Sequence, residues 1–151
     1  MPAPEPLTVL PPEGGSWWKT MYHTTTPEAA GKILASKRFL PGGGGFLGSG
    51  IYFSTTASEA CHRARIGNKA SAVTLRADVR IGRVGVWPQG SVITPSDIHH
   101  YKLDSAKVDC IDSYAIFASN SYRQNPAKRI RNIAVESGVP DDPPAKRRRL
   151  F

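Results

Sequence analysis

The sequence predicts an α+β fold that is rich in strands and has few helices. Residues 72–79 alternate between apolar and polar side chains, which is typical of a half-buried strand. A glycine-rich loop runs directly into Ile51, Tyr52 and Phe53, three residues that favour a strand. Further strands are expected near 19–23, 82–87, 114–117 and 130–135.

One helix start is well defined. In Thr25-Thr26-Pro27-Glu28, Thr25 is predicted as the N-cap, with Glu28 as its capping-box partner. Proline is tolerated in a first helical turn, and this helix is expected to end near Ser36 or Lys37. A second, shorter helix is expected over 58–64, and residues 91–104 are expected to form a surface loop or a short helix.

Composition limits the class of protein. The chain has 151 residues, 40% of them apolar, which suits one domain with a real core. No apolar run approaches the roughly 18 residues of a membrane span, so no membrane partner is expected. The two cysteines, Cys61 and Cys110, are too few for a disulfide scaffold, and neither has metal-ligand spacing. We therefore expect a reducing compartment and no metal.

The chain divides into three parts by composition. Residues 1–15 are proline-rich and predict a flexible or extended arm, residues 16–137 predict the folded domain, and residues 138–151 predict a basic flexible tail. The net charge is +8, and four of these charges come from the run Lys146, Arg147, Arg148 and Arg149.

The tail resembles a nuclear localisation signal, which implies an import receptor as a partner through its four basic residues. A nuclear location is therefore favoured over a cytoplasmic one. The alternatives are a cyclin-docking motif at residues 148–151 and a basic solubilising end that touches nucleic acid weakly.

Candidate binding residues surround the glycine-rich loop, Gly42 to Gly50. Consecutive glycines let the backbone approach a ligand closely or let a loop move, and Tyr52 behind them would form a flat wall for an aromatic ligand. His23 is expected at a strand end beside a helix N-terminus, where a phosphate or a ribose hydroxyl can be held. The alternative is a flexible hairpin that leads into an ordinary core strand.

These residues carry a resemblance to a known family. Tyr22-His23-Thr24-Thr25, a helix, the glycine-rich loop and then Gly50-Ile51-Tyr52-Phe53-Ser54 resemble the catalytic domain of the poly(ADP-ribose) polymerase family, in the ADP-ribosyltransferase superfamily. The strand at 73–79 and the segment from 109 to 131 resemble later parts of that domain, so the similarity spans roughly 21–135.

The resemblance implies a split antiparallel β-sheet that holds NAD, the co-substrate, bent in a cleft. It implies that His23 hydrogen-bonds the adenosine ribose and that the backbone of Thr24 holds the nicotinamide amide. Thr25 would donate its hydroxyl to the ribose, Tyr52 would stack on nicotinamide, and the loop ending at Gly50 would border the site. Without the resemblance, His23, Thr25 and Tyr52 have structural interpretations as a strand-end histidine, a helix cap and a core aromatic.

The helix after this strand departs from the family. Family members commonly offer a small hydroxyl residue and then a second stacking aromatic there, and these positions fall near Ala60 and Arg63. Neither supplies the expected group, and Ser58 or His62 would have to substitute. Ser58 and Arg63 are therefore included among the expected cofactor-binding residues.

The third catalytic position also departs from the family. Transferases of this family often have a glutamate at the start of a strand reading roughly E-Y-x-V-x-(D/N)-P before a basic, apolar ending, and its carboxylate stabilises the cation that develops on the ribose. Alignment on the segment 125–130 places Asn120 there, with Ser119 and Ser121 as alternatives. Because an amide brings no negative charge, losing this group often costs on the order of a hundredfold in rate.

The predicted function is accordingly a NAD-dependent mono-ADP-ribosyltransferase that releases nicotinamide and modifies a protein or nucleic-acid acceptor; polymer formation is not expected. Two alternatives stay open. One is a weak or inactive relative that binds NAD or ADP-ribose, and the other is a basic nucleic-acid-binding domain unrelated to NAD.

Overall fold

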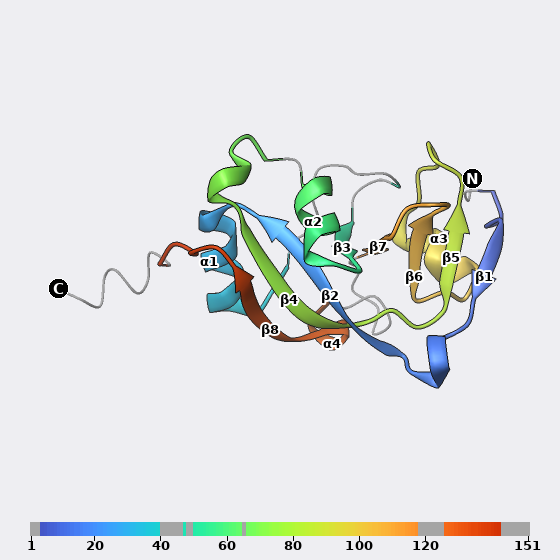
Figure 1. The fold of residues 1–151 in the computed structure, drawn as a ribbon. Coiled ribbons are helices and arrows are strands. Elements are labelled where there is room, and N and C mark those ends of the chain that lie inside the picture. Colours follow the sequence, from blue (N-terminus) through green and yellow to red (C-terminus); the bar gives the residue numbers. More distant parts are fainter. Residues whose placement is uncertain (1–3, 40–46, 48–49, 65, 118–125, 143–151) are drawn as a thin grey trace.

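The α+β class is confirmed by the computed structural model, which describes residues 4–39, 47, 50–64, 66–117 and 126–142 (Figure 1). The strands are β1 (Thr8–Leu10), β2 (Trp18–Thr25), β3 (Ile51–Ser54), β4 (Val73–Arg80), β5 (Val84–Trp87), β6 (Ser105–Val108), β7 (Ser113–Ile116) and β8 (Ile130–Ser137). The α-helices are α1 (Pro27–Ser36), α2 (Ala57–Arg63), α3 (Pro95–His100) and the short α4 (Pro126–Arg129), and Glu13–Gly15 and Lys69–Ser71 form 3-10 turns.

The eight strands form one sheet in the order β1-β5-β6-β7-β3-β2-β4-β8. All neighbours are antiparallel except β5 and β6, which are parallel. The pairing of β2 with β4 extends over eight positions, whereas β2 and β3 pair only at Tyr22 and Ser54. The sheet therefore consists of two halves that meet at a seam between β2 and β3.

The buried apolar residues form two clusters, and the first of them spans the seam. One cluster, the α1 core, joins Ala30 and Ile33 of α1 to buried residues of β2, β3 and β4 such as Met21, Phe53 and Leu75. The other, the α3 core, gathers buried residues around α3, β5, β6 and β7, with Trp87 as the largest. Strand alternation places the two cores on opposite faces at β3, because Phe53 packs in the first and Tyr52 packs against the second.

The start of α1 differs from the prediction by one residue. Thr26, not Thr25, is the N-cap, and its hydroxyl accepts a hydrogen bond from the Ala29 N–H at 3.2 Å. Thr25 is the last residue of β2 and pairs with Val73, so the ladder to β4 keeps it in the strand. The helix ends as expected at Ser36.

The amino-terminal segment, expected as an arm, contributes an edge strand. β1 pairs with β5, and the Trp87 indole N–H donates to the Pro4 carbonyl at 2.8 Å. At the other end of the described chain, the Asp141 N–H donates to the Pro27 carbonyl at 2.9 Å. Strand β6, which the sequence did not predict, lies between β5 and β7.

The short-helix interpretation of residues 91–104 is confirmed in part by α3. Thr94 and Asp97 form a complete capping box at its start. None of the helices among the described residues has the length and apolar character that crossing a membrane requires.

Candidate functional site

The candidate site lies at the seam, where backbone pairing between β2 and β3 stops and the His23 side chain bonds a carbonyl group of β3. After the single pair Tyr22–Ser54, His23 Nδ1 lies 2.7 Å from the carbonyl oxygen of Tyr52. A carbonyl only accepts, so the hydrogen of this bond lies on Nδ1. In the neutral ring, Nε2 is then an acceptor, which is suited to a hydroxyl donor such as a ribose.

The surroundings of His23 favour this neutral ring. Its ring centroid is 5.2 Å from that of Phe39, edge-on, and 5.6 Å from that of Phe53. Burial lowers the pKa of His23 below its ordinary value of 6.5, and the hydrogen bond to the Tyr52 carbonyl opposes this only in part. His23 is therefore uncharged at neutral pH and acts as a fixed hydrogen-bonding group.

Tyr52 is held from both ends. Its carbonyl accepts from His23, and its phenol oxygen accepts a hydrogen bond from the Leu47 N–H at 3.0 Å. Leu47 is buried in the α3 core, and its own carbonyl accepts from Ile93 at 2.6 Å. The Tyr52 ring thus packs against the α3 core and the His23 ring against the α1 core, so the two side chains meet through a backbone group, not face to face.

Two buried pairs of hydroxyl groups, one on each side of the seam, lie on the face of the sheet that carries Tyr52. Thr24 Oγ1 is 2.8 Å from Thr74 Oγ1, and Ser54 Oγ is 2.8 Å from Ser113 Oγ. All four residues are buried, and α2 contacts β2, β3 and β4 on either side of the seam. Thr24, expected to act through its backbone, therefore has its side chain engaged within the protein.

The third catalytic position predicted from the sequence is not covered by the described part of the chain. Asn120, Ser119 and Ser121 lie outside the described residues. Among the described strands, β7 begins with Ser113 followed by Tyr114, and it pairs directly with β3. The first four positions of the family pattern, E-Y-x-V, can be compared with S-Y-A-I at 113–116, whereas the later (D/N)-P positions have no counterpart after them in the sequence. Anchoring the alignment on Tyr114 would have found this match in the sequence.

No carboxylate stands in for the glutamate on the strands at the seam. The sequences of β2, β3 and β7 contain neither aspartate nor glutamate. Ser113 offers a hydroxyl group already bonded to Ser54. The described strands at the seam therefore bring hydrogen-bonding groups together but no negative charge.

The other predicted residues are dispersed. Thr25 is half-buried at the end of β2, and Gly50 is buried against the ring of Phe117 just before β3. Ser58 is exposed on α2, and Arg63 Nε contacts Glu59 Oε1 at 2.6 Å. Arg63 thus lies in an ion pair of α2 itself.

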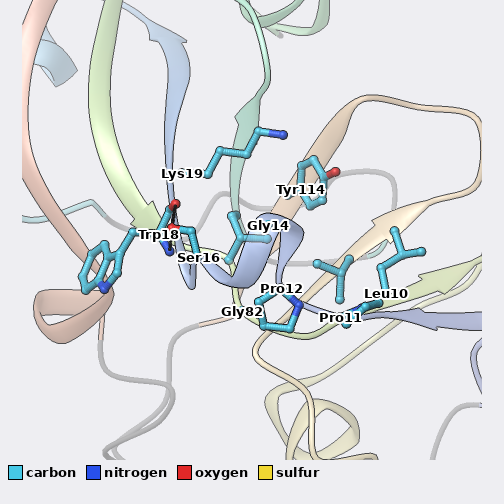
Figure 2. Close-up of a pocket in the computed structure, with 11 residues that line it drawn as sticks. Leu10, Pro11, Pro12, Gly14, Ser16, Trp18, Lys19, Gly82 and Tyr114 are labelled. Carbon is cyan, nitrogen blue, oxygen red and sulfur yellow. Dashed lines mark hydrogen bonds between the residues drawn. The ribbon is translucent and has the colours of Figure 1, made fainter.

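A cavity of about 660 Å³ lies apart from the seam (Figure 2). It is bordered by the turn after β1, the start of β2 and the turn between β4 and β5. Lys19 and Tyr114 extend toward one another above it, with the Lys19 ammonium 6.0 Å from the Tyr114 ring centroid. None of the residues predicted for NAD binding lines this cavity.

Within the described part of the chain, no group of three or more His, Cys, Asp or Glu side chains is arranged to hold a metal ion. Comparison of the chain with known protein families, curated proteins and solved structures finds no match.

Proposed function

We propose that the chain binds NAD at the seam and transfers single ADP-ribose groups to a protein or nucleic-acid acceptor, with release of nicotinamide. The observation that carries the proposal is the break in the β2–β3 ladder, where His23 bonds the Tyr52 carbonyl. In the ADP-ribosyltransferase superfamily, which the sequence resembles, NAD lies in the cleft of a split sheet beside matching residues.

Each group at the seam has a role in this proposal. The Nε2 acceptor of His23 receives a hydroxyl of the adenosine ribose, and the half-buried Tyr52 ring provides a wall for nicotinamide. The backbone of Thr24 lies next to the point where the ladder to β3 stops, and a carboxamide can pair there as a neighbouring strand would. Ser113 occupies the position of the family's glutamate and can hydrogen-bond a ribose hydroxyl.

The absence of a carboxylate from β2, β3 and β7 favours a second candidate, a module that binds NAD or ADP-ribose without transferring it. Cleavage of the nicotinamide bond develops positive charge on the ribose, which a serine hydroxyl stabilises far less than a carboxylate does. Binding of NAD needs no such charge, so the two candidates share a site and differ in turnover.

Incubation of the pure protein with labelled NAD, with and without candidate acceptors, tests the proposal. Transfer of label to the protein or to an acceptor supports it if Tyr52→Leu abolishes transfer and the surface variant His99→Gln, at an exposed residue of α3, does not. NAD-dependent thermal stabilisation without transfer supports the binding module, because a ligand at 100 times its Kd stabilises by about 2.7 kcal/mol. If NAD produces neither transfer of label nor thermal stabilisation, both candidate functions are wrong.

Ser113→Glu tests the assignment of the third position. It places a carboxylate at the start of β7, so NAD turnover should rise by roughly a hundredfold if the alignment is right. Ser91→Glu, in a surface loop, is the matched control. Thermal unfolding of both variants separates a misfolded protein from an unchanged rate.

A further inference from the structure

Two indole rings and two guanidinium groups lie close together where β2, β4 and β8 run side by side. The Arg131 guanidinium lies 3.8 Å from the ring centroid of Trp18, and the Arg80 guanidinium lies 5.1 Å from that of Trp17. Trp18 and Arg80 are direct cross-strand partners. The two pairs therefore form one continuous cluster across three neighbouring strands, which lie side by side in Figure 1.

Strand register extends this cluster along the same face. After the pair of Trp18 and Arg80, the next pairs on this face of the β2–β4 ladder are Thr20 with Asp78 and then Tyr22 with Arg76. Arg76, Thr20 and Arg131 are exposed, and Tyr22 is half-buried. The residues of β4 that point to the other face of the sheet, such as Leu75 and Ala77, are buried in the α1 core. The face with Arg76 and Tyr22 is therefore the outer one.

The charge of the face is positive but modest. Its three arginines are accompanied by two carboxylates, because Glu136 contacts Arg76 at 3.5 Å and Asp78 lies between the strands. Both oxygens of Asp78 are occupied, at 2.8 Å each, by the Thr20 hydroxyl and the Asn132 amide. Three guanidinium groups and two carboxylates leave a net charge of +1, so charge alone predicts weak binding of any polyanion.

We infer that this outer face binds single-stranded nucleic acid, with phosphates on Arg76 and Arg131 and bases stacked on Trp17, Trp18 and Tyr22. Binding of single strands combines cations that follow the backbone with aromatic rings and guanidinium planes that stack on bases. Stacking contributes about 1–3 kcal/mol per base, which supplies what the modest charge does not. An acidic protein partner would pair its carboxylates with the arginines but would offer no bases to stack on the aromatic rings.

The inference does not depend on the proposed function, because it requires neither NAD nor turnover. It is tested with the full chain and a fluorescently labelled single-stranded oligonucleotide, without NAD, by anisotropy over a range of salt concentrations. Arg131→Gln should weaken binding several-fold and lower the slope of log K against log salt by about one. Arg38→Gln, an exposed arginine that follows α1, is the matched control and should change neither.

Intrinsic fluorescence reports the stacking directly. The chain has three tryptophans, and Trp87 is fully buried, so a change in emission on adding unlabelled oligonucleotide comes from Trp17 and Trp18. We expect quenching by the oligonucleotide and none by inorganic polyphosphate, and Trp17→Leu should weaken binding of the oligonucleotide alone.

Three results would overturn the inference. Equal binding of polyphosphate or polyglutamate would show a purely electrostatic surface, and equal binding of a duplex would exclude stacked single-strand bases. Unchanged affinity in both Arg131→Gln and Trp17→Leu, with both variants folded by circular dichroism, would place any nucleic-acid binding elsewhere on the chain.

Discussion

Replacement of His23 by phenylalanine isolates the hydrogen bond at the seam. The new ring keeps the aromatic packing against Phe39 and Phe53, but it leaves the Tyr52 carbonyl without the donor now 2.7 Å away. A fully buried acceptor that loses its partner costs about 1–3 kcal/mol, and this part-buried carbonyl should lie at the lower end of that range. His23→Ala also loses the ring and leaves a cavity, and large-to-small changes of aromatic side chains cost about 3–5 kcal/mol.

The same variant has a distinctive dependence on pH. Because the folded protein holds the pKa of His23 below 6.5, the unfolded chain binds a proton first as the pH falls. The stability from a neutral His23 is therefore fully present above about pH 6.5 and is lost as the pH falls toward the lower folded pKa. His23→Phe has no such group and should lose this part of the pH dependence.

Urea denaturation followed by circular dichroism, from pH 5 to 8, measures both effects. His62→Gln removes an exposed histidine of α2 and, as the matched control, should leave the urea midpoint at pH 7 nearly unchanged. A His23→Phe protein as stable as the wild type at pH 7, with the same loss of stability below pH 6.5, would refute the bond at the seam.

Three further variants test other parts of the fold. Gly82→Ala should destabilise the protein by about 1–3 kcal/mol, because its φ is +57° and a Cβ there would overlap the Asp104 carboxylate; urea midpoints measure this. Thr94→Ala removes the cap of α3 and should cost about 1 kcal/mol, and Thr94→Ser should restore most of it in the same assay. Trp87→Phe removes the donor to Pro4, so limited proteolysis should cut the amino-terminal segment faster, and an unchanged cutting rate would contradict that anchor.

The strands with clear patterns were predictable because they depend on local alternation. Residues 72–79 alternate strictly, and β4 follows with its apolar side in the α1 core. β6 was not, since its alternation covers only four residues with two apolar side chains, and its burial comes from neighbouring strands on both sides. The sequence predicts an arm at β1 because prolines flank its three residues on both sides. Its partner β5 is far along the chain, so no local pattern indicates the pairing.

The candidate site was predictable in part. His23 and Tyr52 meet at one point of the sheet, but through a carbonyl group that carries no sequence signal. The pairing of Ser54 with Ser113 joins residues 59 positions apart, and only the register of β3 against β7 reveals it. The choice between Thr25 and Thr26 as the cap depended on how far the β4 ladder extends, which local residue preferences do not determine.

The order of the strands has a consequence for how the sheet unfolds. Following the chain, β1 belongs to one half of the sheet, β2 to the other, β3 to the first, β4 to the second, β5 to β7 to the first, and β8 to the second. The backbone therefore passes from one half to the other five times. Neither half is a continuous stretch of sequence that can be cut out and folded alone, and the five connections act as tethers. Because the α1 core also packs Phe53 of one half against Met21 and Leu75 of the other, the two halves are expected to unfold together and not one after the other.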